Sequence, residues 1–355
     1  MVYFIPFFLL GERGFVYKET WIVKNMLKNI VFIVAISCLI ISCKTKSSSE
    51  STSENTAMSL VKAPAFSGDS AYNYIEAQVK FGPRVPNSSA HQKAGDYLVQ
   101  KLKQVGCGVI EQKFIATTYD GKKLNARNII GSINPAATKR IILASHWDSR
   151  PTADEDSTNK TGPIAGANDG ASGVGVLIEL ARTIQQAVQK PNVGIDIIFF
   201  DVEDWGNSSL AKDPFGGFCL GSQYWAANKH TPNYSAYYGI LLDMVGAKGA
   251  TFPREGFSVK YAGDINRNVW NIASQLGYRM YFIDQDGGSI TDDHLPVNET
   301  AKIPMIDIIH TQVKGSSKTF FEDWHTHEDD MRNIDRQTLK AVGQVLIQTL
   351  YQEEK

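Results

Sequence analysis

Neither sign of charge predominates in this sequence: 36 lysine and arginine residues stand against 37 aspartate and glutamate residues, for a formal net charge of -1. Without a basic excess the chain lacks the usual signature of a nucleic-acid-binding protein, so we expect no nucleic acid partner. Cysteine is scarce as well, with 4 in 355 residues, which excludes a small disulfide-stabilised scaffold. The 43% of apolar residues is typical of globular proteins and excludes a mostly disordered chain. The sequence is therefore that of a neutral, globular chain of enzyme size.

The apolar run near the N-terminus is too short for a membrane-spanning helix, which needs about 20 residues. It extends from Ile30 to Ile41 after Met26 and Lys28, as in the apolar core of a signal peptide. The run ends at Ser42-Cys43, which resembles a bacterial lipoprotein signal and implies cleavage before Cys43 and lipidation of its sulfur. We expect translation to start at Met26. The alternative is an uncleaved anchor.

These features predict three parts of the chain. Residues 1–43 are an upstream segment plus the signal peptide, residues 44–61 are a Ser/Thr-rich flexible tether, and residues 62–355 are one catalytic domain. The expected location is the bacterial cell envelope, as a periplasm-facing lipoprotein held to the membrane by its lipid alone. Only Cys107 and Cys219 remain in the domain. An exported protein permits a disulfide, and the sequence leaves open whether these two cysteines form one.

Helical and strand patterns alternate through the domain. Apolar residues at helical spacing predict helices over 67–82, 89–105, 173–188 and 337–351. Apolar runs predict strands over 109–116, 126–133, 140–145, 195–200, 237–245 and 303–309. Continuous apolar strands separated by helices predict a single α/β domain whose central, largely parallel mixed sheet is flanked by helices.

Polar residues directly follow three of the predicted strands. His146 follows one strand, residues 201–204 (Asp-Val-Glu-Asp) follow the next, and Asp243 lies near the end of a third. Functional groups of open α/β sheets gather beyond the carboxyl ends of the strands. The sequence therefore predicts a site at this edge of the sheet.

Carboxylate and imidazole without thiolate is the ligand set of a hydrolytic zinc site. Asp169 lies between glycines ahead of a predicted helix, where it suits either a metal ligand or a helix N-cap. Glu203 and Asp204 are adjacent, so they point to different sides of a strand end. One can bind metal while the other faces substrate as a general base. The alternative for this pair is a solvated strand end.

Histidines elsewhere are weaker candidates. His325, in the late Trp-His-Thr-His segment, could complete the ligand set, whereas His310 ends a strand and suits a structural role. Taken alone, residues 292–294 (Asp-Asp-His) are typical of a surface turn. The histidines expected to be merely exposed are His91, His230 and His327.

Six segments together resemble the zinc glutaminyl-peptide cyclotransferases (glutaminyl cyclases), which share their fold and superfamily with co-catalytic zinc aminopeptidases. The segments are SHWDSRP (145–151), GANDGASGVGVLIELAR (166–182), IIFFDVEDWG (197–206), LLDMVGAKGATFP (241–253), DDHLP (292–296) and WHTHEDDMRNID (324–335). The resemblance spans most of the chain after residue 62. It implies a zinc aminopeptidase-like fold, and the lipoprotein signal suggests a bacterial, periplasm-facing member.

The resemblance implies one Zn2+ per chain, bound by Asp169, Asp204 and His325. Many animal cyclases have Glu where this chain has Asp204, which is shorter by one methylene. His146 and Asp243 match positions that bind a second zinc in the aminopeptidases. Because both residues are retained, the number of metal ions stays open at this point.

The family's general base and acid falls on Glu203, and two acids of its hydrogen-bond network fall on Asp243 and Asp292. The indole that packs on the substrate side chain falls on Trp324, and nearby Phe320 would help it to exclude water. The implied reaction converts the N-terminal glutamine of a peptide to pyroglutamate and releases ammonia. The implied partners are peptides with N-terminal glutamine, and we favour a monomer.

Two other functions are alternatives to the cyclase interpretation. A zinc aminopeptidase would hold a second zinc on His146, Asp169 and Asp243 and would hydrolyse the first peptide bond. A non-catalytic binding domain on this fold would have eroded ligands, yet every proposed ligand and the base are present.

Overall fold

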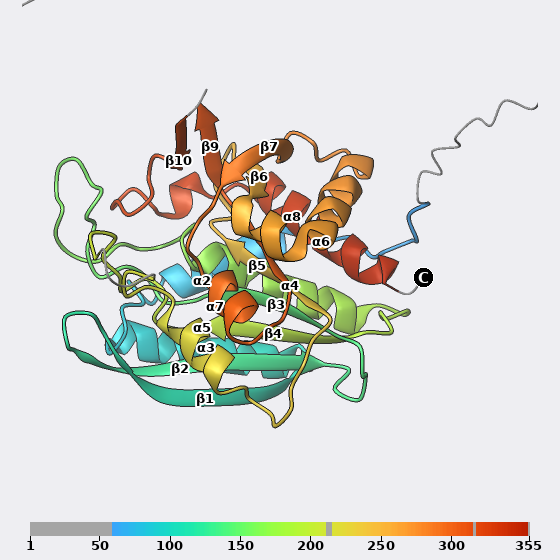
Figure 1. Ribbon diagram of the computed structural model, residues 1–355, viewed down its shortest axis with the longest axis horizontal. Helices are drawn as coiled ribbons and strands as arrows, with labels where there is room; N and C mark the ends of the chain where they lie inside the picture. The colour runs from blue at the N-terminus through green and yellow to red at the C-terminus, as the bar shows by residue number, and fades with distance from the viewer. Residues whose placement is uncertain (1–58, 211–214, 315–316, 354–355) are drawn as a thin grey trace, which may run out of the picture. The chain divides into compact units, whose positions relative to one another are not determined.

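The structure, a computed structural model, describes residues 59–210, 215–314 and 317–353 (Figure 1). The predicted signal peptide and nearly all of the predicted tether lie outside these residues. Val61, which the sequence places in the tether, is hydrogen-bonded through its backbone to Gln352 and Gln348. The fold therefore begins slightly earlier than the sequence indicates.

Six strands form the central sheet, in the order β1-β2-β4-β3-β5-β8. Their bounds are β1 Gly108–Thr117, β2 Lys123–Ile133, β3 Arg140–His146, β4 Gly194–Phe200, β5 Tyr238–Asp243 and β8 Met305–Ile309. The last four strands of this order are mutually parallel, while β1 and β2 are antiparallel to their neighbours. The prediction of a largely parallel mixed sheet is confirmed.

Two small sheets lie outside the central one. Strands β6 (Phe252–Glu255) and β7 (Phe282–Gly288) are parallel, and β9 (Thr311–Lys314) and β10 (Ser317–Phe320) are antiparallel. These four short strands were not predicted from the sequence. They matter for function because Gly288 and Phe320 both line the cavity that contains the predicted site residues.

Helices cover both faces of the central sheet (Figure 1). Their bounds are α2 Gly68–Val79, α3 Ser89–Gln104, α4 Ala171–Gln186, α5 Leu220–Ala227, α6 Gly256–Gln275, α7 His294–Glu299 and α8 Arg336–Gln352, with a 3-10 turn at Met331–Asn333. Because successive side chains of a strand point to opposite faces, Ile197 joins a core with α2, α3, α4, α6 and α8, whereas Ile198 joins one with α5 and α7. The sheet is thus buried on both sides, as parallel sheets require.

Local signals explain most of the helix boundaries. The side chains of Ser67, Ser88 and Asp335 accept hydrogen bonds from backbone N–H groups at the starts of α2, α3 and α8, as N-cap residues do. The four helices that the sequence predicts are all present, with ends within a few residues of the prediction. No helix among the described residues is long and apolar enough to cross a membrane.

The two cysteines of the domain are not bonded to one another. Cys107 and Cys219 are both buried and free, which answers the question that the sequence left open. Cys219 has φ 59° and its thiol lies 3.5 Å from Oε1 of Glu203.

Candidate active site

Three parallel strands deliver polar residues to one edge of the sheet. His146 ends β3 and Asp243 ends β5, and both of these residues are buried. Glu203 and Asp204 follow β4, which pairs with β3 on the side opposite β5. The side chains therefore converge at the carboxyl edge of the strands, where the sequence places the site.

A cavity of about 570 Å³ opens at this edge. All eight residues that the sequence nominates line it. They are Asp169, Glu203, Asp204, Asp243, Asp292, Phe320, Trp324 and His325. A pocket of this size, in which charged side chains converge beside aromatic rings, suits a small-molecule or peptide-end site.

The turn that carries Asp169 is shaped by a glycine. Gly170 has φ 85°, and a Cβ there would lie 2.5 Å from the backbone oxygen of Asp148 and 2.9 Å from Cε1 of His146. Only glycine fits this approach and this backbone region. The side chain of Asp169 forms no N-cap hydrogen bond at α4, which removes the capping alternative.

Asp169, Asp204 and His325 form one group whose ligand atoms lie within 4.8 Å of one another. Nε2 of His325 is 3.2 Å from Oδ1 of Asp204 and 3.7 Å from Oδ2 of Asp169. Ligands of a tetrahedral zinc ion at about 2.0–2.2 Å are about 3.3–3.6 Å apart, so these spacings suit one ion. Oδ2 of Asp204 is buried and has no hydrogen-bond partner, as expected where a cation completes the site. The residues present therefore fit a bound zinc ion.

The charges of this group are poorly balanced without a cation. Burial and the nearby Asp204 carboxylate raise the pKa of Asp169. Burial opposes ionisation of Asp204 too, but His325 and Arg150 outweigh it and lower the pKa of that carboxyl. Burial disfavours the charged form of His325, yet the neighbouring carboxylates raise its pKa to about 9. Carboxylates crowded in a buried place attract a cation, which is the electrostatic condition for a metal site.

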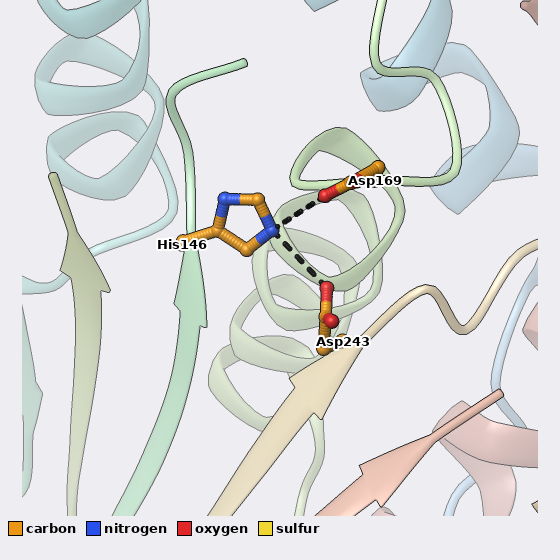
Figure 2. A group of neighbouring side chains, drawn as sticks. All are labelled: His146, Asp169 and Asp243. Carbon is orange, nitrogen blue, oxygen red and sulfur yellow. Dashed lines mark hydrogen bonds and ion pairs between the residues drawn. The ribbon is translucent and has the colours of Figure 1, made fainter. Parts of the chain in front are cut away.

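His146 faces a second pair of carboxylates. Its Nε2 lies 3.0 Å from Oδ1 of Asp169 and 3.1 Å from Oδ1 of Asp243 (Figure 2). These three residues form a second group that could hold a metal ion. Burial lowers the pKa of His146, but the three carboxylates around the ring, which include Asp148, raise it well above its usual value.

Glu203 is held at the cavity by the buried Asp148. The two oxygens of Asp148 accept hydrogen bonds from the backbone N–H groups of Glu203 and Asp204, at 3.1 Å and 3.2 Å. Val202, directly before this pair, has φ 54°, a conformation that is strained for a β-branched residue. Burial raises the pKa of Glu203, and the neighbouring carboxylates raise it further. A carboxyl group tuned upward in this way suits a general base and acid near neutral pH.

The acidic cluster at residues 292–294 is not a surface turn, so that interpretation, made from the segment alone, is wrong. Asp292, Asp293 and His294 are 3%, 0% and 0% exposed. Burial raises the pKa of Asp292. Nε2 of His294 lies 3.2 Å from Oε2 of the buried Glu255, a partner that lies 39 residues earlier in the chain. The cluster is thus part of the wall behind the cavity.

Aromatic rings also line the cavity. The ring of Trp324 stacks on His325 at 3.7 Å between centroids, and Phe320 lies 4.5 Å from Trp324. Trp147 is completely buried and stacks on His91 at 4.2 Å between ring centroids. The sequence-based expectation that His91 is exposed is therefore wrong: it is 4% exposed and its Nε2 lies 2.8 Å from Oδ1 of Asp201.

Of the remaining histidines, His310 follows expectation, whereas His230 and His327 do not. His310 is buried, stacks on Phe321 and lies beyond the end of β8, which is consistent with a structural role. Burial lowers the pKa of His310 to about 4. His230 and His327 are half-buried rather than fully exposed.

Several buried groups that support the site escaped the sequence analysis. The guanidinium of Arg84 donates to the backbone oxygens of Trp147, Ala165 and Gly166. Asp329 accepts hydrogen bonds from the backbone N–H groups of residues 168 and 169, at 2.8 Å and 3.0 Å. Both residues fix the turn that carries Asp169. Their partners are main-chain atoms, which leave no residue pattern in a sequence.

Comparisons with known proteins agree with this geometry. The profile of peptidase family M28 matches residues 128–350. The crystal structure of a Bacteroides thetaiotaomicron glutaminyl cyclase bound to N-acetylhistamine is 49% identical, covers 82% of this chain and 99% of its own, and has a TM-score of 0.78. A structure described as a Zn-dependent exopeptidase from Parabacteroides distasonis is 51% identical, covers 82% and 99%, and has a TM-score of 0.78. The glutaminyl-peptide cyclotransferase of Bos taurus is 26% identical over 288 residues, which are 74% of this chain and 76% of its own.

The family profile covers more than half of the chain, and its span holds every residue of the cavity that the sequence nominates. The fold matches the solved bacterial cyclases over nearly their whole length. The chain therefore belongs to peptidase family M28, and within it is similar to bacterial glutaminyl cyclases and to a Zn-dependent exopeptidase.

Proposed function

We propose that this protein is a glutaminyl-peptide cyclotransferase, which converts the N-terminal glutamine of peptides to pyroglutamate and releases ammonia. One observation carries the proposal: Glu203, with its raised pKa, lines the same aromatic-walled cavity as the Asp169, Asp204 and His325 donor set. Similarity to bacterial glutaminyl cyclases at 49% and 50% identity supports the choice among the activities known on this fold.

Asp169, Asp204 and His325 would hold one zinc ion per chain. Bound there, zinc would act as a Lewis acid toward the side-chain amide of the substrate glutamine. The spacing of the three donors and the orphaned Oδ2 of Asp204 support this assignment. Two carboxylates and one imidazole with an open position are a usual ligand set for catalytic zinc.

Glu203 would carry the proton between the two nitrogen atoms of the reaction. The α-amine of the substrate attacks its own side-chain carbonyl carbon, a step favoured by proximity once the glutamine is folded in the cavity. Glu203 takes a proton from the attacking amine and returns it to the departing ammonia. The carboxyl group must therefore be easily protonated, which its raised pKa supports.

Asp243 and Asp292 would hold the substrate amine and the Glu203 carboxyl group in position for proton transfer. Both acids line the cavity, and burial raises the pKa of each of them. Trp324 and Phe320 would exclude water from the reacting carbon. Water attack there would give glutamate instead of the lactam, so this aromatic wall would govern the fidelity of the reaction.

A zinc aminopeptidase is the second candidate function. The observation that favours it is the His146, Asp169 and Asp243 group, which could hold a second metal ion. Some similar structures are described as a Zn-dependent exopeptidase and as a leucine aminopeptidase precursor. The curated relatives are named glutaminyl-peptide cyclotransferase, which favours the cyclase.

A single experiment separates the two activities. The chain without residues 1–43 is incubated with a short peptide that begins with glutamine, and the products are identified by mass spectrometry. A cyclase gives the intact peptide less one ammonia, and a chelator suppresses the change. Release of free glutamine with a shortened peptide would reject the cyclase and assign His146 to a second metal.

We also infer that the protein is a lipoprotein of the bacterial cell envelope that faces the periplasm. The support is the sequence alone: an apolar run of signal-peptide length that ends at Ser42-Cys43. Cys43→Ser should abolish incorporation of labelled palmitate and release the protein from membranes.

For the assembly we propose a monomer, which light scattering of the purified domain would test.

A further inference from the structure

Arg150 joins the backbone and the side chain of one proposed metal ligand. Its Nη1 donates to Oδ1 and to the main-chain oxygen of Asp204, both at 3.1 Å, and its Nη2 donates to the main-chain oxygen of Gly206 at 3.2 Å. Arg150 is only 5% exposed. The guanidinium plane therefore restricts rotation of the Asp204 carboxylate and fixes the main chain that carries it.

The same guanidinium also donates hydrogen bonds to a second carboxylate, that of Asp154. Nε and Nη2 of Arg150 donate to Oδ1 and Oδ2 of Asp154 at 2.7 Å and 2.6 Å. This two-point contact between planar groups sets orientation as well as attraction. Asp154 lies only four residues after Arg150, in the irregular segment that follows β3.

Asp154 in turn faces a second proposed ligand. Its Oδ1 lies 3.4 Å from Nδ1 of His325, on the side of the ring opposite Nε2, which faces Asp169 and Asp204. The backbone N–H of Glu155 donates to the main-chain oxygen of His325 at 3.3 Å. This segment therefore supports His325 through both its ring and its backbone.

We propose that Arg150 and Asp154 form a clamp that positions Asp204 and His325 for zinc. The inference rests on the metal site of the proposed function. With zinc on Nε2, the 3.4 Å contact between Nδ1 of His325 and Oδ1 of Asp154 would shorten to a hydrogen bond that holds the ring proton on Nδ1, as carboxylate partners of metal-binding histidines do. Arg150 binds both Asp154 and Asp204. It therefore fixes the position of the Asp204 ligand directly and that of the His325 ligand through Asp154. Both clamp residues are positioning residues, since neither touches the metal or the substrate.

The clamp also accounts for aspartate rather than the longer glutamate at position 204. Because Arg150 reaches both the carboxylate and the main chain of residue 204, the carboxylate is tied close to its own backbone. A glutamate would carry its carboxylate one methylene further and would lose one of these two contacts or displace the guanidinium.

The test measures zinc affinity directly, by titrating the metal-free protein with zinc in competition with a chromogenic chelator. Arg150→Lys keeps the positive charge but loses the two-point contact of the guanidinium. Asp154→Asn removes the carboxylate that faces His325 and leaves Arg150 in place. Each variant should bind zinc about 10–100-fold more weakly, the usual cost of losing such a support. The double variant should bind zinc only slightly more weakly than the single variant with the lower zinc affinity, because the two residues act as one unit.

A matched control lies at the start of β3, the strand that precedes the segment with Arg150. Arg140 begins β3 and forms an equally short two-point contact with the buried Asp196, at 2.6 Å and 2.6 Å. Arg140→Lys removes a fork of the same kind far from the metal ligands. It should lower the melting temperature of the metal-free protein while zinc affinity and kcat stay at the wild-type values.

The outcomes separate this inference from the function on which it rests. If the wild-type protein takes up no zinc, the proposed metal site fails and the clamp with it. If the wild-type protein binds zinc and both variants bind it equally well, the clamp alone is rejected. A loss of affinity that Arg140→Lys reproduces would likewise reject the clamp, because it would reflect general destabilisation.

Discussion

Oδ1 of Asp169 lies 3.0 Å from Nε2 of His146, while the other oxygen of this carboxylate faces His325. The Asp169 carboxylate thus faces two imidazoles. We assign His325 to the proposed zinc ion, and we do not assign His146 to it. In Figure 2 the same nitrogen of His146 also faces Asp243. His146, Asp169 and Asp243 therefore form the group at which a second ion would bind, and they share Asp169 with the first group.

The number of metal ions distinguishes the two candidate functions. We expect activity of the metal-free protein to be restored in full by one equivalent of zinc, because the proposed cyclase uses only the Asp169, Asp204 and His325 group. The measurement is a titration of turnover against added zinc, with bound metal determined by elemental analysis. A further rise in turnover on the second equivalent would contradict this and favour the two-metal aminopeptidase.

Loss of the Glu203 carboxylate should abolish turnover without loss of metal. Glu203→Gln keeps the size of the side chain but cannot accept the amine proton, so kcat should fall by about 10²–10⁴-fold, the usual contribution of general acid–base catalysis. Zinc content should match that of the wild type. The exposed Glu322→Gln is the control and should retain full turnover. Retained turnover in Glu203→Gln would remove this residue from the base role.

Trp324 should matter for both binding and product identity. Its ring stacks on His325 and lines the cavity, so Trp324→Ala should raise KM and admit water to the reacting carbon. We expect glutamate to appear beside pyroglutamate in the mass spectrum of the products. Trp324→Phe, which retains an aromatic face, should shift KM less and should form little glutamate. Equal behaviour of the two variants would argue against an aromatic wall.

Acid should weaken the fold through Glu255. Burial opposes the charged form, but hydrogen bonds from Ser258, the backbone of Ile290 and the neighbouring His294 outweigh it and lower the pKa of Glu255 to about 2. Because this pKa is depressed from 4.5, the stabilisation is fully present above pH 4.5 and is lost as pH falls toward 2.

Urea unfolding of the wild type and of Glu255→Gln measures this contribution. At one pKa unit per 1.36 kcal/mol, the shift corresponds to at most about 3 kcal/mol at neutral pH. The difference in unfolding free energy between the two proteins should shrink as the pH is lowered from 6 to 3. The exposed Glu322→Gln should change stability by about 0.5 kcal/mol or less at either pH. A difference that stays constant with pH would refute the depressed pKa.

Residues that follow apolar strands were predictable from the sequence, because burial and polarity change abruptly there. His146, Glu203, Asp204 and Asp243 all lie where that pattern places them, around one cavity edge. Asp169 was predictable from its glycine-flanked turn. The resemblance to a known family supplied what the pattern could not, namely the roles of Asp292 and Trp324.

Other features depend on contacts between distant segments and leave no local signal. His91 appeared to be an ordinary exposed histidine, but Asp201, which lies 110 residues later, holds it in the core. The 20-residue helix α6 went unpredicted because its sequence contains glycines and several asparagines, which are poor helix formers. Packing on β8 and α8 and the Glu255 cap stabilise that helix in the fold.

Arg150 and Asp154 illustrate the same limit at the site itself. Their spacing of four residues suggests an ordinary surface ion pair, and no residue type distinguishes them from the other charged residues of the segment. Their contacts with Asp204 and His325 arise only when three separate segments meet.

The left-handed conformations of Val202, Met244 and His325 have a consequence for the order in which the protein fails. Each costs about 1–3 kcal/mol and persists only while its surroundings impose it. Val202 and Met244 are held by small apolar clusters outside the main core. Warming should release these turns before the sheet separates, so that activity disappears at a lower temperature than the secondary structure. The working temperature of the enzyme is then set by a few backbone turns rather than by the melting point of its fold.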